Sequence, residues 1–181
     1  MVFSAHYDHL GMQGNAMFPG ASDNASGCSM ILYLARYYSE HKPPCNMVFI
    51  LFSGEEAGLI GSDYFTSFPT FDIHKIKMLV NIDIMGDAKN GITVVNGEVF
   101  KDKFDALVKI NQEKGYLPEV RIRGKARNSD HYHFSEKGVP AFFIYSMGGA
   151  GFYHDVFDKA NTLSLTNYEN TAKLLIDFVN R

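Results

Sequence analysis

Several features that would indicate other classes of protein are scarce or absent in this sequence. It has no tryptophan and only two cysteines among its 181 residues. It has no basic excess, because 17 lysines and arginines face 20 acidic residues, and the net charge of -3 disfavours nucleic-acid binding. No apolar run approaches the ~20 residues that a membrane-spanning helix needs. With 46% hydrophobic and 20% charged residues, the composition predicts a folded chain rather than a disordered one.

The two cysteines are predicted to be free thiols. Cys28 lies near the start of a predicted helix, and Cys45 lies just past the end of the same helix. A helix of that length separates its ends by roughly 20 Å, whereas a disulfide needs Cα atoms within about 7 Å. The cysteines therefore say nothing about the redox compartment.

Short apolar segments alternate with helical patterns along the chain. Helices are predicted where apolar residues recur at helical spacing, over Ala25–His41, Phe100–Lys114 and Asn167–Val179. Strands are predicted over segments rich in β-branched and aromatic residues, which are Met1–Ala5, Met47–Phe52, Met78–Ile84, Ile92–Val95, Glu119–Ile122 and Ala141–Tyr145. This alternation predicts an α/β fold, a three-layer sandwich with a mixed, largely parallel sheet flanked by helices. No segment has the composition of a linker, so residues 1–181 are predicted to form a single domain.

Two of the strand candidates are apolar at every position. Met47–Phe52 and Ala141–Tyr145 carry no charged side chain. Strands of a parallel sheet that are covered by helices on both faces have this composition. We therefore expect both strands to be covered on both faces.

Histidine and carboxylate side chains follow the predicted strands at the points where those strands end. They are His6 and Asp8 after the first strand, Asp23 before the first helix, Glu55 and Glu56 after the second strand, Asp83 at the end of the third, and His154 after the glycine-rich loop 148–151. In open α/β sheets, ligands bind outside the carboxyl ends of the strands. We expect these side chains to converge there, although they are scattered along the sequence.

Each of these residues also has an ordinary structural interpretation. A lone loop histidine such as His6 is usually a surface or capping residue, and acidic residues such as Glu55 and Glu56 often begin a helix. Asp83 is harder to explain in this way, because it lies among apolar residues where an unpaired carboxylate is costly. The adjacency of Glu55 and Glu56 is also informative, since successive side chains in an extended segment point opposite ways. One can bind a metal while the other faces a water or substrate.

Six short motifs resemble those of peptidase family M28, a family of zinc aminopeptidases. In order they are Ala5–His9, Gly20–Gly27, Gly54–Gly58, Asn81–Gly86, Ser129–His131 and Tyr153–His154. The resemblance covers essentially the whole chain. It implies two zinc ions per chain, with Asp23 shared between them, His6 and Asp83 completing one site, and Glu56 and His154 completing the other. It also implies that Glu55 is the general base.

The resemblance implies further roles and a substrate class. The substrate would be a peptide with a free N-terminus. Asp8 would orient the His6 imidazole, Asp130 would support the site, and the peptide bond after Asp23 would be cis. Tyr153 either donates its hydroxyl to the oxyanion or only packs. The remaining histidines are expected to be structural or exposed; they are His9, His41, His74, His131 and His133.

Two other functions fit the same motifs. A glutaminyl-peptide cyclotransferase, which uses a single zinc, has similar ligands, but it typically places tryptophan around its pocket. A non-catalytic binding domain would commonly have lost ligands, whereas here all the ligand positions and Glu55 are filled. Family catalytic domains usually have further strands and a helix before the segment of His6, so we expect an N-terminally truncated catalytic domain. Related bacterial enzymes are often exported, which implies a periplasmic or extracellular location.

Overall fold

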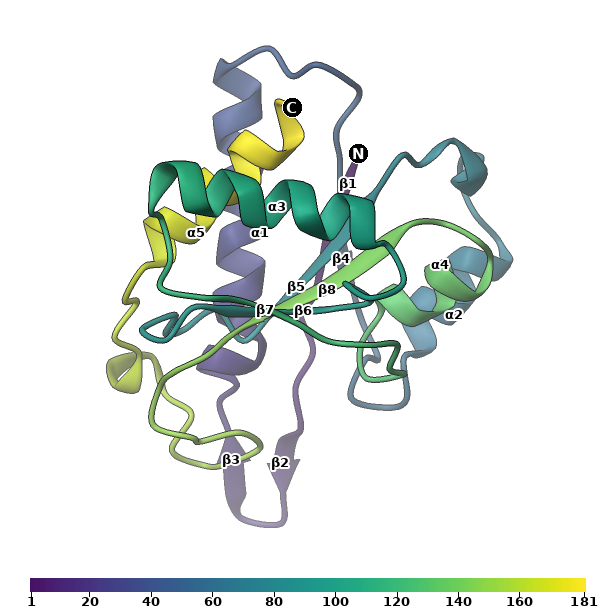
Figure 1. Ribbon diagram of the computed structural model, residues 1–181. Coiled ribbons are helices and arrows are strands. Elements are labelled where there is room, and N and C mark those ends of the chain that lie inside the picture. The colour runs from purple at the N-terminus through teal and green to yellow at the C-terminus, as the bar shows by residue number, and fades with distance from the viewer.

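A six-stranded sheet forms the middle layer of the molecule (Figure 1). The computed structural model describes residues 1–181 throughout. The strands are β1 (Val2–His6), β4 (Val48–Phe52), β5 (Leu79–Asp83), β6 (Ile92–Val95), β7 (Val120–Ile122) and β8 (Ala141–Ser146). They lie in the order β4-β1-β5-β8-β6-β7. Only the β6–β8 pair is antiparallel, so the predicted mixed, largely parallel sheet is confirmed.

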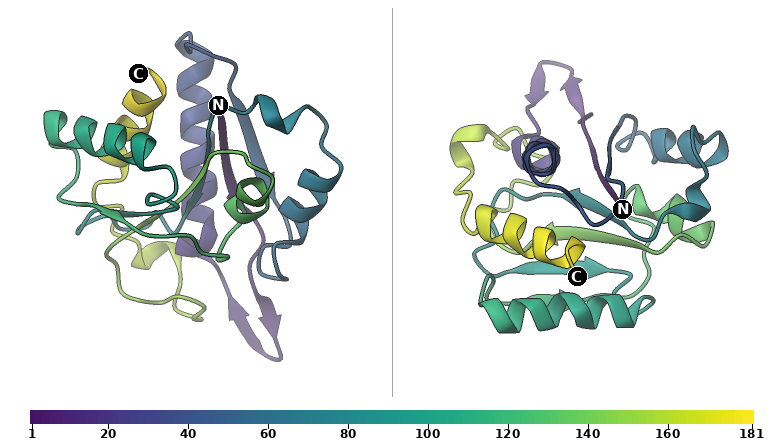
Figure 2. Two further views of the ribbon diagram at one scale, coloured as in Figure 1. Left: turned by 45° about the vertical axis from the view of Figure 1, so that its right-hand side comes forward. Right: turned by 90° about the horizontal axis from the view of Figure 1, so that it is seen from above.

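Helices cover both faces of this sheet (Figure 2). One face carries α1 (Gly27–Glu40), α3 (Lys101–Lys114) and α5 (Tyr168–Val179), which pack with the larger apolar cluster. The other face carries α2 (Ile60–Ser67) and α4 (His131–Glu136), beside a smaller cluster. The strand side chains alternate accordingly, because successive residues of a strand point to opposite faces. Phe3 and Ala5 of β1 lie in the larger cluster, whereas Val2 lies in the smaller one.

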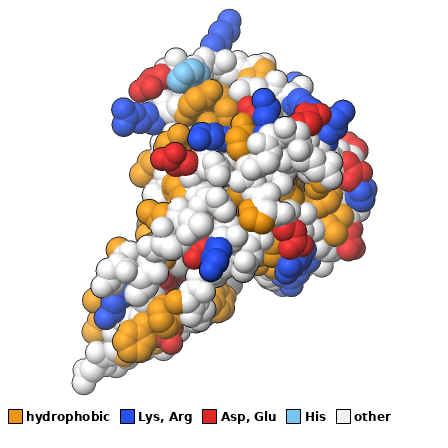
Figure 3. Space-filling view, turned by 60° about the vertical axis from the view of Figure 1, so that its left-hand side comes forward, with side chains coloured by type: hydrophobic (Ala, Val, Ile, Leu, Met, Phe, Trp, Pro, Cys, Tyr) orange, Lys and Arg blue, Asp and Glu red, His pale blue; other side chains and the backbone are white.

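The structure also contains elements that the sequence analysis did not predict. They are α2, α4, the strands β2 (Gly11–Gln13) and β3 (Ala16–Phe18), and two 3-10 turns at Ile73–Lys75 and Ala160–Thr162. β2 and β3 form a separate hairpin that projects from the body as a narrow arm (Figures 1 and 3). Both cysteines are free, as predicted. None of the helices combines the length and the apolar character needed to cross a bilayer.

The prediction that Met47–Phe52 is covered on both faces is confirmed in part, because Met47 and Phe49 pack against the larger cluster and Val48 and Ile50 against the smaller one. β4 is an edge strand, and only its last residue, Phe52, is buried, while Leu51 is 40% exposed. An apolar sequence shows that both faces of a strand are apolar, but not that the strand has a neighbour on each side. The same prediction for Ala141–Tyr145 is confirmed, because β8 lies between β5 and β6 and is almost fully buried.

Candidate metal centre

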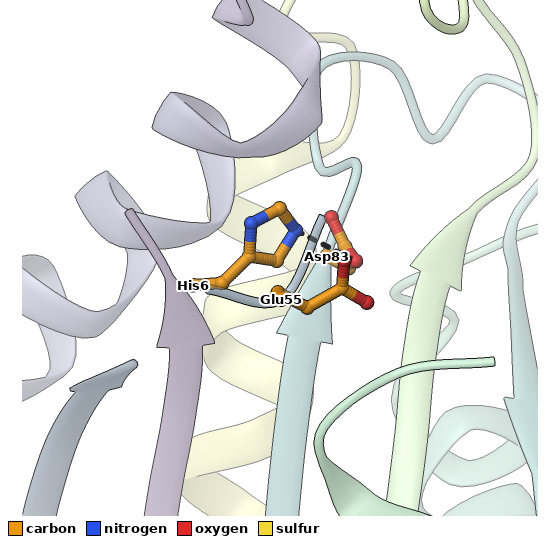
Figure 4. A group of neighbouring side chains, drawn as sticks. All are labelled: His6, Glu55 and Asp83. Carbon is orange, nitrogen blue, oxygen red and sulfur yellow. Dashed lines mark hydrogen bonds and ion pairs between the residues drawn. The ribbon is translucent and has the colours of Figure 1, made fainter. Parts of the chain in front are cut away.

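Three side chains from different elements meet at the carboxyl end of the central strands (Figure 4). His6 ends β1, Asp83 ends β5, and Glu55 lies in the turn after β4. His6 Nε2 lies 3.2 Å from Asp83 Oδ2 and 3.2 Å from Asp23 Oδ1. We call His6, Glu55 and Asp83 the inner half of the centre. His6 and Asp83 stand on the neighbouring strands β1 and β5, whereas Glu55 lies in a turn.

The other nitrogen of His6 is held by the backbone. Nδ1–H donates a hydrogen bond to the carbonyl oxygen of Asp8 at 3.1 Å, which directs Nε2 toward the carboxylates. The carboxylate of Asp8 has a different task, since it accepts hydrogen bonds from the backbone N–H groups of Glu55 and Glu56, both at 3.2 Å. Asp8 therefore contacts the imidazole through its carbonyl oxygen, while its carboxylate Oδ1 lies 3.7 Å from His6 Nδ1. Asp8 also fixes the turn that carries both glutamates.

Burial and charge shift the pKa values of the inner half. Burial disfavours a charged His6, but hydrogen bonds with Asp23 and Asp83 outweigh it and raise the pKa of His6 to about 12. Burial raises the pKa of Asp83 above its ordinary value. It also raises the pKa of Glu55 to about 8, against the opposing charge of His6 and with a further contribution from Asp83. Carboxylates that favour a proton on the imidazole would favour a metal cation at the same place.

Asp23 lies between two histidines in an irregular helical segment, Ala21–Ser26, that leads into α1. Its backbone is non-helical, with φ -111° and ψ 91°, and the Asp23–Asn24 peptide bond is cis, as predicted. The carboxylate of Asp158 accepts hydrogen bonds from the backbone N–H groups of Ser22 and Asp23 at 2.8 and 3.0 Å. Asn24 donates through Nδ2 to the carbonyl of Ile82 in β5. The segment is therefore tied both to the sheet and to a distant loop.

Glu56, His154 and His9 form a second group, which we call the outer half. His154 Nε2 lies 3.3 Å from Asp23 Oδ2 and 3.1 Å from Glu56 Oε2. The other Glu56 oxygen, Oε1, accepts a hydrogen bond from His9 Nδ1–H at 2.8 Å. All three residues lie outside the strands of the sheet, and the His154 side chain is 34% exposed. Asp23 therefore faces the inner half with one oxygen and the outer half with the other.

Two further predicted residues lie close to this centre without touching the same atoms. The Tyr153 ring stacks on His154, with centroids 3.9 Å apart, and burial with nearby carboxylates raises the pKa of its hydroxyl to about 12. Asp130 is fully buried where α4 begins, and burial raises its pKa to about 6. Its charge adds to the forces that raise the pKa of Glu55. Asp130 makes no hydrogen bond to the predicted ligands.

The structure gathers every predicted ligand and adds two residues that the sequence analysis missed. His9 was expected to be structural or exposed, yet His9, Asp23 and Glu56 place possible ligand atoms within 4.8 Å of one another. Asp158 is 1% exposed and holds the segment of Asp23. The position of His9 in the first motif was the only available signal for it. Nothing in the sequence singled out Asp158.

The donor set fits a divalent cation such as zinc. Imidazole nitrogens and carboxylate oxygens are ordinary zinc ligands. The buried Nε2 of His154 makes no hydrogen bond, although two carboxylate oxygens lie within 3.3 Å of it. The structure also holds two residues near these carboxylates in the left-handed region, Ile84 at φ 49° and His154 at φ 53°. For a β-branched residue such as Ile84 this is unusual, and such outliers cluster at functional sites.

The α/β sandwich, with this donor set at the carboxyl ends of its strands, has the architecture of an α/β metalloenzyme. The sequence model of peptidase family M28 matches residues 1–179, so the chain belongs to that family. The predicted resemblance is confirmed.

Individual relatives agree with this assignment. A probable zinc metalloprotease of Pyrenophora teres f. teres is 36% identical over 89 residues, which cover 46% of this chain and 19% of that protein. A glutaminyl-peptide cyclotransferase of Bos taurus is 25% identical over 221 residues, covering 99% of this chain and 61% of that protein. The solved aminopeptidase from Aneurinibacillus sp. strain AM-1 superposes with a TM-score of 0.79 at 28% identity, over 98% of this chain and 42% of that one. The chain thus spans only part of each of these proteins.

Proposed function

We propose that this chain is the catalytic region of a zinc-dependent aminopeptidase that removes the N-terminal residue of peptides and holds two zinc ions. The observation that carries the proposal is the position of Asp23. Its Oδ1 lies 3.2 Å from His6 Nε2 and its Oδ2 lies 3.3 Å from His154 Nε2. A carboxylate with one oxygen directed at each of two histidines is arranged to be shared between two ions. Asp83 would complete the inner site and Glu56 the outer one.

Zinc supplies polarisation of the peptide carbonyl and a lowered pKa of the attacking water when it is bound. The chain itself supplies the proton transfers. Glu55 belongs to the inner half and takes no part in the contacts of Asp23 with the two histidines. It accepts the proton of the attacking water and returns it to the leaving amine.

Tyr153 is positioned to act on the other side of the reacting carbonyl. Its ring stacks on His154, and its side chain lines the same cavity as Glu55 and Asp83. We propose that its hydroxyl donates a hydrogen bond to the oxyanion that forms during hydrolysis. A tyrosine hydroxyl keeps its proton at neutral pH, because its ordinary pKa is about 10.

A glutaminyl-peptide cyclotransferase is the second candidate, because a protein of that name aligns with nearly the whole chain. The two-sided position of Asp23 favours two ions, whereas the cyclotransferase would use one. The absence of tryptophan also favours the aminopeptidase. The predicted periplasmic or extracellular location stays a proposal from the family resemblance, and fractionation of the native cells would test it.

The deciding experiment measures zinc and activity on the same preparation. Elemental analysis after zinc loading at neutral pH should approach two ions per chain. A panel of aminoacyl chromogenic substrates should be hydrolysed, and a glutaminyl peptide should not be cyclised. Saturation at one ion together with cyclisation would overturn the proposal in favour of the cyclotransferase. Because the chain spans only part of its relatives, the panel is best run beside a full-length family member.

A further inference from the structure

Two of the five arginines have no carboxylate partner. Arg36 pairs with Glu40, Arg121 with Glu119 and Arg181 with Glu113. Arg123 and Arg127 lie within ion-pair distance of no acidic side chain, although both belong to the segment that follows β7. A guanidinium is always charged and carries a planar set of donors that matches a carboxylate. These two donor sets are therefore available to a ligand.

Both unpaired arginines border cavities around Glu55. Arg123 lines a cavity of about 210 Å³ together with Glu55, Asp83, Tyr145 and Asn128. Arg127 lines a second, more open cavity that also includes Glu55 and Asn128. The first cavity is smaller than the ~300–1,000 Å³ typical of a site for a drug-sized ligand. It suits the end of a peptide, next to the general base.

The structure holds Arg123 in place before any ligand arrives. Its backbone N–H donates to the carbonyl of Val94 at 3.0 Å, and Asn96 N–H donates to the carbonyl of Gly124 at 3.3 Å. The guanidinium Nη1 donates to the Tyr145 hydroxyl at 3.2 Å. Tyr145 is the register partner of Asp83, so this contact holds the guanidinium beside the inner half. A group that is already positioned loses less conformational entropy on binding.

The Arg127 guanidinium is also supported. Its central carbon lies 5.2 Å from the centroid of the Tyr132 ring, in a cation–π contact that leaves the donor edge free. If the two arginines only balanced the acidic cluster, they would lie against its carboxylates. Instead, each is held by an aromatic side chain and borders open space.

We propose that Arg123 and Arg127 bind a carboxylate of the substrate close to the scissile bond. This inference rests on the proposed peptidase function and narrows its substrate class. The carboxylate would come from one of two places, either an acidic side chain at the N-terminal residue or the free C-terminus of a dipeptide. Both present the same planar anion to the guanidinium groups.

Two matched substrate pairs test the proposal on the zinc-loaded protein. The first pair is glutamyl and glutaminyl p-nitroanilide, and the second is leucyl-alanine and leucyl-alanine amide. We expect kcat/KM to favour the carboxylate member of one pair by about tenfold or more, equivalent to about 1.4 kcal/mol. The pair that shows the preference identifies the source of the carboxylate. The preference should shrink as ionic strength rises.

Single variants test whether the two arginines cause the higher kcat/KM for the carboxylate substrate. Arg123→Gln and Arg127→Gln should each move the ratio toward unity. The matched control is Arg121→Gln, which lies on β7 and removes only the exposed pair with Glu119, so its ratio should equal that of the wild type. Ratios near unity for both pairs in the wild type would overturn the proposal, as would a preference that survives both variants.

Binding separates failure of this proposal from failure of the proposed function. Calorimetry on the zinc-loaded protein compares the Kd of glutamate with that of glutamine, and the Kd of leucyl-alanine with that of its amide. If the carboxylate ligand binds more tightly, and Arg123→Gln removes the difference, the proposal holds even where no substrate is hydrolysed, and the peptidase function fails. If nothing is hydrolysed and neither pair shows a difference in Kd, both are overturned.

Discussion

The inner and outer halves of the centre use the same kinds of side chain but stand on different supports. In the inner half, His6 and Asp83 end β1 and β5 and their side chains are 1% and 7% exposed, while Glu55 shares a turn with Glu56. The outer half lies on loops, and the His154 side chain is 34% exposed. Sites that stand on strands are held more precisely than sites that stand on loops. We therefore expect the inner half to be rigid and costly to disturb, and the outer half to exchange its ion more readily.

The largest expected effect separates the adjacent glutamates, one from each half. Glu55→Gln keeps the size of the side chain but cannot accept a proton, so turnover should fall by roughly 10²–10⁴-fold. KM and zinc content should stay near those of the wild type. Steady-state kinetics and elemental analysis on the same sample measure both.

Glu56→Gln is the matched variant for this test. A neutral amide is a poorer ligand for a divalent cation, so zinc content should fall and excess zinc should restore part of the activity. If Glu55→Gln loses zinc while Glu56→Gln keeps both ions and loses only rate, the two roles must be exchanged.

The next effect compares the two histidines that face Asp23. His6→Ala leaves Asp23 and Asp83 buried without their partner, which should lower the free energy of unfolding by roughly 3–5 kcal/mol. His154→Ala removes a partly exposed group and should cost less than about 1 kcal/mol. Urea unfolding of the metal-free proteins measures both. Equal losses would remove the distinction between the halves.

A third effect tests how strongly burial near the inner half disfavours a protonated histidine. His131 follows Asp130 at the start of α4 and is fully buried, and desolvation lowers its pKa from 6.5 to about 4. The folded state binds fewer protons than the unfolded state between these values, so this contribution is present above pH 6.5 and is lost as the pH falls toward 4. The loss should approach about 3 kcal/mol.

Urea unfolding across this range, for the wild type and for His131→Phe, isolates the contribution. The variant should lack this part of the pH dependence, because phenylalanine does not titrate and fits the stack on Phe143. Identical pH profiles would show that His131 is accessible to protons in the folded state.

The smallest effect concerns His9 in the outer half. His9→Ala removes the hydrogen bond that orients Glu56, which should weaken the binding of one zinc ion by roughly 10–100-fold. Competition with a chromogenic chelator measures this without reference to activity. The control, His41→Ala, lies at the end of α1 far along the chain and should leave both affinities unchanged. Loss of the more tightly bound ion instead would place His9 with the inner half.

Much of the fold and all of the proposed ligands were predictable, for identifiable reasons. The helices α1, α3 and α5 have long amphipathic patterns, and the proposed ligands lie within the short motifs that resemble those of family M28. The elements α2, α4, β2 and β3 are too short for periodicity to reveal them. The edge position of β4 depends on strand order, which composition does not contain.

The missed site residues depend on tertiary contacts. Asp158 reaches Asp23 across 135 positions of sequence, and a loop aspartate carries no local sign of such a contact. His9 packs against Gly20, where a Cβ atom would lie 2.6 Å from His9 Cγ. His9 and Gly20 come together because the β2–β3 hairpin between them brings the chain back to its base. A sequence pattern does not describe that closure.

The β2–β3 hairpin connects the segment of His6 to that of Asp23, and it pairs with no other strand. Its two strands pair from Gly11 with Phe18 to Gln13 with Ala16, and only Gly14 and Asn15 lie between them. The two ends of the hairpin therefore lie side by side at its base. A longer hairpin would leave the positions of the metal-centre residues unchanged. Exposed hairpin tips of this kind tolerate inserted sequence. Natural lineages and protein engineers alike can lengthen this arm, or fuse a second domain at Gly14, without separating the two ligand-bearing segments at its base.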